Sequence, residues 1–507
     1  MLGGFHLQGL VNFRLALVSG LGGTVSSIIY SLVFVPLCLA YLPLDRYGLW
    51  ALMLQLIRYL DMMDAGVSGA SFRLFSAANQ TGEPVKVSRI WTASLLLQGL
   101  QGAAIILMGT LLLVPFADFF KLAPEVREEF LSVFQVIVCL GAARFVLRPF
   151  GMLARSHHLH HRLNCLVPVA LLGGLLVLSF GLQAGWGIWA LTAAFFWEWA
   201  WMGLGPVVIS WQAGLIPSWR SWRLPEMASF RSLCDFGYKL FLVQSAVLVT
   251  QSMPLLIASR MGSLEAGAVW SIGSRVANLI KDILTQIDSA AAPGVFSIAS
   301  QNKVEELKSR LLDLVRLSLI VGSGLAAMYA AWNENFVLLW TSGRIDFPFL
   351  ASAGLAVFVA MNGAFHSFCL GSQARLAMGP VAKAAVREII LGPLFCAGGW
   401  MCAGHVGLAW GQAAALSLGM LSTSLGWFLS HFAIRPATFF HKAGVPALLV
   451  FAVCLGSSLG ANDFINAETW IGWGTAVLIS LLVSGGLLFA AWKTWRFGKT
   501  VDGKNLT

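Results

Sequence analysis

The segment LALVSGLGGTVSSIIYSLVFVPLCLA, residues 15–40, decides the fold because none of its 26 side chains is charged. A helix needs about 20 apolar residues to cross the hydrocarbon of a bilayer. The segment is longer than the roughly 7–15-residue apolar core of a secretion signal, and it lacks a small-residue cleavage site. We therefore expect it to remain in the protein as the first membrane span.

The rest of the chain continues this pattern. The sequence has 507 residues, of which 58% are hydrophobic and 11% charged, whereas a soluble domain has roughly 25% charged residues. This composition excludes a soluble enzyme, a disordered chain and a secreted disulfide scaffold. Two-residue alternation is absent, which argues against a barrel and leaves helices as the elements that satisfy the backbone in lipid. The sequence thus predicts an all-α polytopic membrane protein with about 14 transmembrane helices. The expected spans are 15–41, 47–71, 91–117, 129–154, 163–184, 187–212, 235–259, 266–290, 314–340, 348–374, 386–403, 407–430, 444–461 and 469–492.

Basic residues predict the orientation of these spans. The formal net charge is +10, and in a membrane protein such an excess belongs to cytoplasmic loops. With the N-terminus inside, 21 Lys and Arg residues fall in inner loops and five in outer loops. We therefore expect both termini in the cytoplasm and no nucleic-acid partner. The five outer residues are Arg46, Lys121, Arg127, Arg260 and Arg344.

An internal repeat predicts the domain organisation. A shift of 220 positions brings similar residues together at separated places, and each half then carries six spans, an even number. The halves are therefore expected to be parallel repeats with a cleft between them, as in many transporters. We expect a first six-helix lobe at 1–217, a second at 218–433, and two extra helices with a short cytoplasmic tail at 434–507. The matches are Trp50 with Trp270, Asp45 with Glu265, Phe116 with Phe336, Ala154-Arg155 with Ala374-Arg375, and Gly187-Ile188 with Gly407-Leu408.

Charged residues within the spans are the main functional signal. Each costs about 2.5–3.5 kcal/mol at the middle of the bilayer, so each is expected to face protein or water. The deep cations suit an anionic ligand such as a phosphate or pyrophosphate, because arginine offers two parallel N–H donors. We expect these side chains to bind it: Arg58, Arg144, Arg148, Arg275 and Lys281.

Three acids are candidates for ion coupling: Asp61, Asp64 and Glu198. An alternative reading gives the cations of two spans a purely structural role, as internal ion pairs between Arg58 and Asp61 and between Lys281 and Asp288. No metal site and no cofactor are expected. Asp61 and Asp64 form a lone D-x-x-D, which is too weak a signal for magnesium without a second acidic segment.

A group of histidines follows the fourth span: His157, His158, His160 and His161. Their spacing allows metal binding, but a solvated loop near phosphate head groups is the favoured interpretation. The cysteines form no C-x-x-C pair, so they indicate neither a zinc site nor a disulfide framework.

Several short stretches resemble bacterial polysaccharide-unit flippases of the O-antigen type. Residues 47–50 (YGLW) and 59–66 resemble the second span of that family. Residues 266–275 and Ala292-Pro293 resemble its eighth span, and residues 404–411 resemble the start of its twelfth, with Trp410 in place of a small residue. The resemblance implies the multidrug/oligosaccharidyl-lipid/polysaccharide exporter superfamily, whose members have twelve to fourteen helices in two lobes. Residues 15–40 carry neither the acid typical of drug extruders nor the arginines typical of lipid II flippases.

The resemblance implies a flippase, not an enzyme, that moves a polyprenyl-pyrophosphate-linked oligosaccharide across the bacterial inner membrane by alternating access, for surface polysaccharide or lipopolysaccharide synthesis. The expected partners are the lipid-linked oligosaccharide and membrane lipids, with a polysaccharide polymerase and chain-length proteins as further candidates. The alternatives are a drug, small-molecule or ion antiporter of the same fold, and a membrane enzyme acting on lipid-linked sugar.

Overall fold

The predicted all-α polytopic membrane fold is confirmed. The computed structural model describes residues 2–64, 66–81, 83–218, 222, 245–301, 303–375, 378–464, 469–483 and 485–486, and the elements found there are helices. Eight of these helices are long and apolar enough to cross a membrane. All fourteen expected spans fall on helical residues wherever the structure describes them, apart from their ends and short internal breaks.

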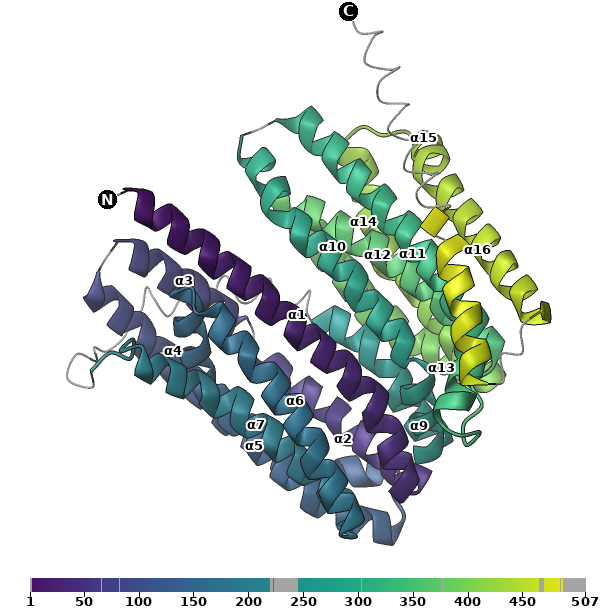
Figure 1. Ribbon diagram of the computed structural model, residues 1–507, viewed down its shortest axis with the longest axis horizontal. Coiled ribbons are helices and arrows are strands. Elements are labelled where there is room, and N and C mark those ends of the chain that lie inside the picture. Colours follow the sequence, from purple (N-terminus) through teal and green to yellow (C-terminus); the bar gives the residue numbers. More distant parts are fainter. Residues whose placement is uncertain are drawn as a thin grey trace, which may run out of the picture. The chain divides into compact units, whose positions relative to one another are not determined.

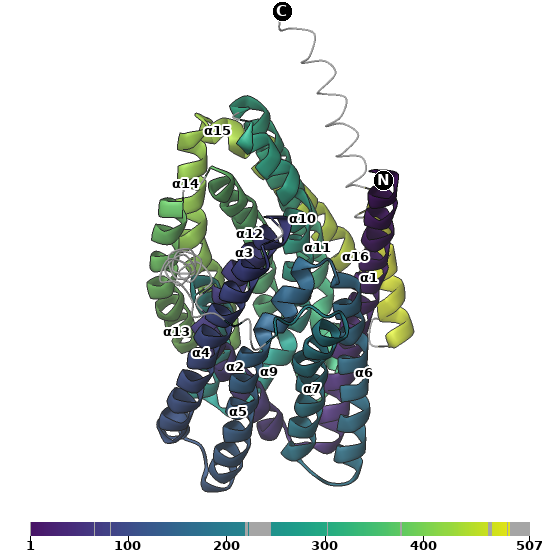
Figure 2. The same cartoon turned by 90° about the vertical axis from the view of Figure 1, so that its left-hand side faces the viewer.

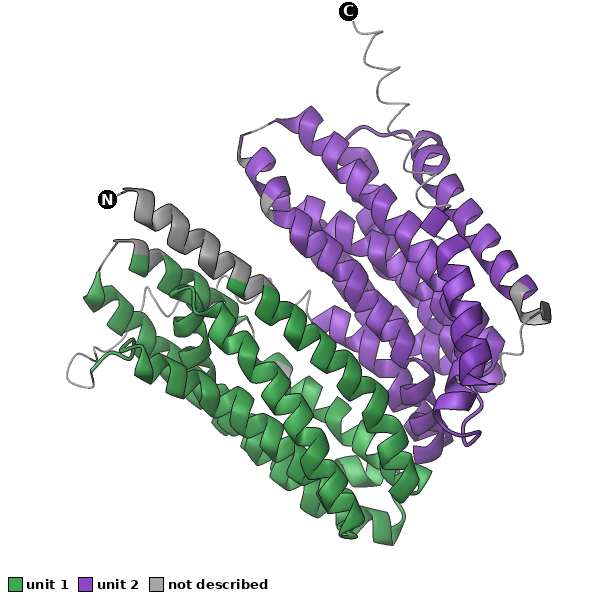
Figure 3. Cartoon of the chain, in the orientation of Figure 1, with its two compact units in different colours: residues 1–244 green, residues 245–507 purple. Residues whose placement is uncertain are grey.

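The helices form two compact units, Met1–Gln244 and Ser245–Thr507 (Figure 3). In the first unit α4 and α5 run side by side, as do α6 and α7, and α1 packs against α6 (Figures 1 and 2). This unit contains α1 (Leu2–Tyr41), α2 (Leu44–Asp61), the 3-10 turn η1 (Met62–Asp64), α3 (Val67–Thr81), α4 (Pro84–Phe119), α5 (Pro124–Ser156), α6 (His160–Gln183) and α7 (Ile188–Gln212).

In the second unit α11 packs against both α12 and α16, and α12 packs against α13. The unit begins, within the described residues, with helical residues 245–257 and ends with a helix at Trp470–Val483. Between them lie the π-turn η3 (Ala258–Gly262), α9 (Leu264–Gly273), α10 (Arg275–Ser300), α11 (Val304–Trp340), α12 (Phe349–Ala374), α13 (Met378–Leu416), the π-turn η4 (Ser417–Leu421), α14 (Ser422–His431), α15 (Pro436–Phe439), the π-turn η5 (Phe440–Gly444) and α16 (Val445–Phe464).

Large apolar side chains lie on the outer surface of the units as well as in their cores, and several polar side chains are buried, a distribution expected for a protein in lipid. On α4, Leu100, Leu107 and Leu111 are 61–66% exposed, and their spacing places them on one helix face. Gln98 on the same helix is fully buried. The exposed leucines are therefore suited to lipid contact, while the amide is kept for contacts within the unit.

The second expected span of the first unit is a broken helix. The α-helical pattern ends at Asp61, tightens into η1, and resumes at Val67 after Gly66, whose φ of +78° favours glycine. The Asp64 carboxylate accepts a hydrogen bond from the Ser68 N–H at 3.4 Å, which satisfies a free donor at the start of α3. The break thus places the side chain of Asp64 where a straight helix would not.

The corresponding span of the second unit is also interrupted, between α9 and α10 at Ser274. The Gly273 carbonyl accepts hydrogen bonds from the Tyr329 hydroxyl at 3.0 Å and the Asn333 amide at 3.1 Å. Both donors belong to α11, so the neighbouring helix satisfies the carbonyl at this interruption.

One glycine in each unit has nearly the same unusual backbone conformation. Gly187, before α7, has φ +58° and ψ −133°, and Gly404, within the α13 range, has φ +54° and ψ −130°. The turn at Gly404 divides α13 into two helical segments, which matches the expected spans 386–403 and 407–430. Gly404 lies 217 positions after Gly187, close to the predicted offset of 220. The two parallel repeats with boundaries at 217 and 433 stay a proposal, and this shared turn supports it.

The two segments of α13 approach each other at Gly399 and Gly407. A Cβ atom on Gly399 would meet the Gly407 carbonyl more closely than real Cβ atoms approach any heavy atom. By contrast, a Cβ atom on the adjacent Gly398 would meet nothing within 4 Å. Of these two neighbouring glycines, Gly399 but not Gly398 therefore requires the absence of a side chain for packing.

We expect Gly399→Ala to destabilise the protein by about 1–3 kcal/mol, because the backbones must separate to accept the methyl group. Gly398→Ala is the matched control and should be neutral or stabilising by up to about 1 kcal/mol, since it only improves helix propensity. Thermal unfolding of both variants in detergent measures the difference. Equal midpoints for the two variants would contradict the close approach.

Candidate functional site

Two of the predicted ligand-binding arginines line one cavity in the first unit. Arg144 and Arg148 lie four residues apart on α5, so their side chains leave the same helix face. The cavity has a volume of about 330 Å³. Its polar lining also includes Asp64, Ser68, Arg155 and Asn164. Three arginines and one carboxylate make its lining basic.

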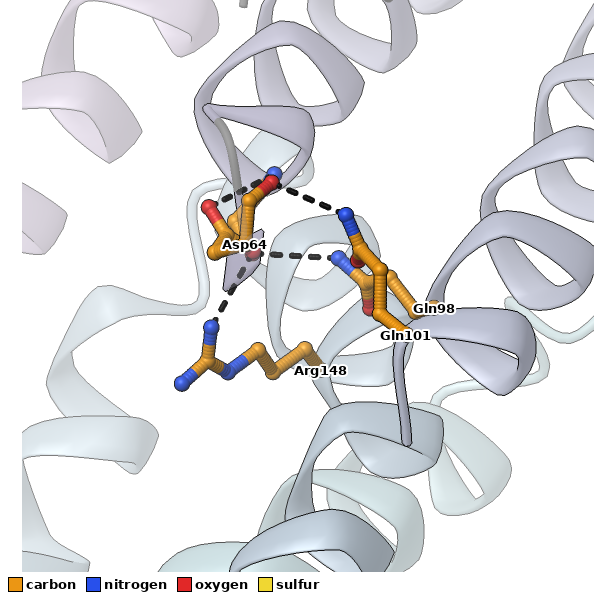
Figure 4. Close-up of polar contacts among 5 residues, drawn as sticks. Asp64, Gln98, Gln101 and Arg148 are labelled. Carbon is orange, nitrogen blue, oxygen red and sulfur yellow. Dashed lines mark hydrogen bonds and ion pairs between the residues drawn. The ribbon is translucent and has the colours of Figure 1, made fainter. Parts of the chain in front are cut away.

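Arg148 is paired with the candidate coupling acid Asp64 (Figure 4). The guanidinium Nη1 lies 3.1 Å from Oδ1 of Asp64, and the two side chains are only 19% and 17% exposed. Phe145, one turn earlier, places its ring 3.8 Å from the guanidinium carbon. The pair brings α5 together with the break after α2.

Two glutamines of α4 complete this polar cluster (Figure 4). Gln98 donates to the Ser68 hydroxyl at 3.0 Å, and that hydroxyl donates to Oδ1 of Asp64 at 2.6 Å. Gln101 donates to the Asp64 carbonyl at 3.1 Å. The side-chain oxygens of both glutamines are buried and have no hydrogen-bond partner. The two glutamine amides therefore contact the break between α2 and α3 at the Ser68 side chain and at the Asp64 backbone.

Glu198, the third candidate coupling acid, lies on α7 in the same unit. Its carboxylate is hydrogen-bonded to Tyr30 of α1 and interacts electrostatically with Arg144. Each of the two deep arginines of α5 thus has an acid from another element nearby: Arg144 has Glu198, and Arg148 has Asp64.

The remaining predicted residues of the first unit lie on α2. The Arg58 side chain is exposed at the surface of the described residues, and it makes an interaction within the protein. The Asp61 side chain lies outside the described residues. The alternative Arg58–Asp61 ion pair therefore stays a prediction.

In the second unit, Arg275 and Lys281 both lie on α10. Arg275 is half-buried, whereas Lys281 is only 6% exposed. The Lys281 ammonium donates to the Asn278 side chain at 3.4 Å and lies 4.0 Å from the Asp282 carboxylate. Asp288 instead accepts a hydrogen bond from Ser367 at 2.7 Å, and its second oxygen has no hydrogen-bond partner. These contacts favour other partners for both residues, and the alternative Lys281–Asp288 pair stays a prediction.

Sequence analysis missed a buried acid in the second unit, Glu388 of α13. Its side chain is fully buried; Oε1 accepts from the Thr250 hydroxyl at 3.0 Å, and Oε2 from the Met420 N–H at 3.4 Å. The carboxylate therefore links three helical segments. Its position inside the expected span 386–403 could have identified Glu388 as a buried acid.

Sequence analysis also gave Arg155 no site role, counting it as an inner-loop charge, yet it lies within α5 and lines the cavity. Its position eleven residues after Arg144 and seven after Arg148 places all three on one helix face, and this spacing could have identified it. Gln98 and Gln101, two amides three residues apart within an apolar stretch, were a further signal.

The fold is shared with transporters of known structure. No protein-family model and no curated protein matches the sequence. A lipid II flippase, MurJ, in an inward closed conformation is 12% identical with a TM-score of 0.68, covering 94% of this chain and 99% of that one. An inward-facing multidrug resistance MATE family transporter of the MOP superfamily is 13% identical with a TM-score of 0.67, covering 83% and 99%. At these identities the likeness shows the fold alone.

A third similar structure is a MOP superfamily transporter from Pyrococcus furiosus, described as having a binding pocket of reverse polarity. It is 13% identical with a TM-score of 0.62, and the match covers 84% of this chain and 96% of that one. The similar proteins are transporters, and MATE family members among them are described in inward-facing and outward-facing conformations.

The Asp64–Arg148 pair predicts a measurable coupling. Asp64→Asn and Arg148→Gln should each destabilise the protein, because each leaves one charge partly buried without its partner. The double variant should lose less unfolding free energy than the two single variants together, and the difference, the coupling energy, should be about 0.5–3 kcal/mol. Equilibrium unfolding in mixed micelles of the wild type, the two single variants and the double variant gives this coupling energy.

The exposed pair between Asp118 and Arg127 is the matched control. Asp118→Asn and Arg127→Gln should show a coupling of about 0–1 kcal/mol, because water screens an exposed pair. A coupling at Asp64–Arg148 no larger than this control would contradict a structural role for the buried pair.

Proposed function

We propose that the protein is a flippase that moves a polyprenyl-pyrophosphate-linked oligosaccharide across the bacterial inner membrane by alternating access. The observation that carries the proposal is the cavity lined by Arg144, Arg148 and Arg155 of α5, within a unit whose outer face is apolar. An arginine in the bilayer is costly without a ligand or partner. A diphosphate suits such a cavity because arginine binds phosphate through two parallel N–H donors.

The spacing of the arginines fits the size of the ligand. Residues four apart on a helix have Cβ atoms about 5–6 Å apart, so Arg144 and Arg148 can each bind one phosphate of a pyrophosphate. In this proposal Arg58, Arg275 and Lys281 are further contacts for the head group. The role of these three rests on residue type and depth in the expected spans.

Asp64 and the substrate compete for the same cation in this mechanism. Arg148 donates to Asp64 in the structure, so a bound phosphate has to share or replace that carboxylate. Re-forming the ion pair then offsets the loss of the phosphate contact and favours release. Glu198 has the same relation to Arg144, and Asp61 is retained as a third candidate for coupling to protons or sodium.

The expected cellular setting follows from this function. We propose a bacterial inner-membrane location with both termini in the cytoplasm, and a place in surface polysaccharide or lipopolysaccharide synthesis. A polysaccharide polymerase and chain-length proteins are the proposed protein partners. The similarity in fold to a lipid II flippase supports a lipid-linked substrate.

The second candidate function is export of drugs, small molecules or ions, which the fold of a multidrug resistance transporter supports. The described side chains of α1 between Val18 and Tyr41 include no acid, whereas the drug extruders named above typically carry one there. The cavity of the first unit also has more cations than acids, which suits an anionic substrate better than a cationic drug.

Transport should depend on the two deep arginines of α5. We expect a strain that lacks the gene to accumulate unflipped lipid-linked oligosaccharide, and wild-type protein to restore the surface glycan. Arg144→Ala combined with Arg148→Ala should lower restoration at least about tenfold, because each lost charged phosphate contact costs about 1.5–3 kcal/mol. Extraction of lipid-linked sugars and quantification of the surface glycan provide the measurement.

Arg127→Ala combined with Arg435→Ala is the matched control, since it removes two arginines outside the cavity, at the starts of α5 and α15. This variant should restore the glycan fully. Normal glycan in the Arg144/Arg148 variant at wild-type protein level would remove these residues from the mechanism. Drug resistance on overexpression, with the glycan unaffected by gene deletion, would favour the exporter.

A further inference from the structure

A second, larger cavity opens at one end of the first unit. Its volume is about 1010 Å³, and it lies between the end of α3, the start of α4, the turn between α5 and α6, and the residues after α7. Loop charges predict that this end faces the cytoplasm. The cavity is therefore placed where a ligand from the inner leaflet could enter it.

The polar part of the cavity lining, called the rim, is basic. Arg155 and three histidines, His157, His158 and His160, line it. Among the described residues of the lining Glu83 is the one acid, and it lies 3.9 Å from the Lys86 ammonium. Among the described residues, no group of three or more His, Cys, Asp or Glu side chains is arranged to hold a metal ion. Protonated histidines beside Arg155 suit an anionic group.

Helix α6 begins at this rim. It starts at His160, and no side chain caps its first turn, which also lacks an acid. The first N–H groups of a helix carry partial positive charge and bind anionic groups well. This helix start adds to the basic side chains around it.

Another part of the cavity lining, the apolar wall, consists of hydrophobic side chains. Val87, Leu215 and Ile216 line the cavity and pack against a buried cluster around Trp91 and Leu153. A basic rim beside an apolar wall suits a phosphoryl group that carries a hydrocarbon chain. An entirely water-soluble anion would leave the apolar wall unused.

Arg155 connects the two cavities. It lines both the large cavity at the rim and the smaller one that contains Arg144 and Arg148. The three arginines lie along one face of α5 and span about 16 Å at 1.5 Å per residue. A phosphoryl group moving from the rim toward the deeper site would therefore pass Arg155, then Arg148, then Arg144.

We propose that the rim cavity is a second binding site, specific for the phosphoryl head group of a lipid, from which Arg155 leads to the deeper arginines. Its use as a loading site for transport rests on the proposed function, whereas binding at the rim does not. The ligand chemistry has two sources: the lipid-linked substrate and the anionic phospholipids of the bilayer.

Histidine charge makes binding at this site dependent on pH. Burial lowers the pKa of His157, and neighbouring His158 lowers it further. The other titratable groups lining the cavity are Arg155, His160 and Glu83. A bound phosphoryl group stabilises the imidazolium and raises this pKa, so binding takes up protons. Affinity should rise as pH falls from 8 to 6.

The test uses the full-length protein in neutral detergent, with radiolabelled farnesyl pyrophosphate as the probe. The rim variant combines His157→Gln, His158→Asn and His160→Gln and leaves Arg155 in place. We expect its pH-dependent binding of farnesyl pyrophosphate to be at least about tenfold weaker than that of the wild-type protein. Arg162→Gln is the control, because Arg162 is exposed on α6 and does not line the cavity. Unchanged thermal unfolding of the rim variant verifies that it folds.

The outcomes separate this site from the proposed function. If the rim variant binds farnesyl pyrophosphate as the control does, with the same pH dependence, the rim site is overturned. If instead Arg144→Ala with Arg148→Ala retains the pH-dependent binding and transports normally, the rim site stands and the deeper site fails. Competition by phosphatidylglycerol equal to that by unlabelled probe supports a rim site filled by bilayer lipid. Weaker competition supports the lipid-linked substrate.

Discussion

The ion pair between Arg148 and Asp64 is the contact around which the first unit is organised. A guanidinium inside the bilayer requires an acceptor, and the nearest acid along α5 is far away in the sequence. The break between α2 and α3 supplies the acceptor by turning Asp64 toward α5, and two glutamines of α4 hold the turn in place. The polar cluster around this ion pair therefore connects η1, α3, α4 and α5.

This arrangement explains how a basic cavity can be stable inside the unit. Arg148 has five N–H donors, and its Nη1 lies 3.1 Å from Oδ1 of Asp64. Glu198, which is hydrogen-bonded to Tyr30, interacts electrostatically with Arg144. The acids offset the cost of placing these cations away from water.

The spans were predictable from the sequence because hydrocarbon thickness sets a length that apolar residues must fill. The stretch at 15–40 and the division near residue 404 follow from this rule. The breaks in the helices do not, since they depend on partners from other helices. Gly273 is stabilised by Tyr329 and Asn333 from a later span, and hydropathy carries no record of such contacts.

The candidate site was predictable in residue type but not in pairing. Depth in a span marked Arg144, Arg148 and Glu198 as costly residues that need a partner, and the structure places partners beside them. Asp64 precedes Arg148 by 84 positions, so spacing on one helix could not identify the pair.

Arg155 shows the opposite limit: its position near the end of the span made it look like a loop charge. Its role depends on two cavities that meet at its side chain, and the helical period places it on the face that carries Arg144 and Arg148. A charge at the end of a membrane helix therefore has to be judged by the face on which it lies as well as by its depth.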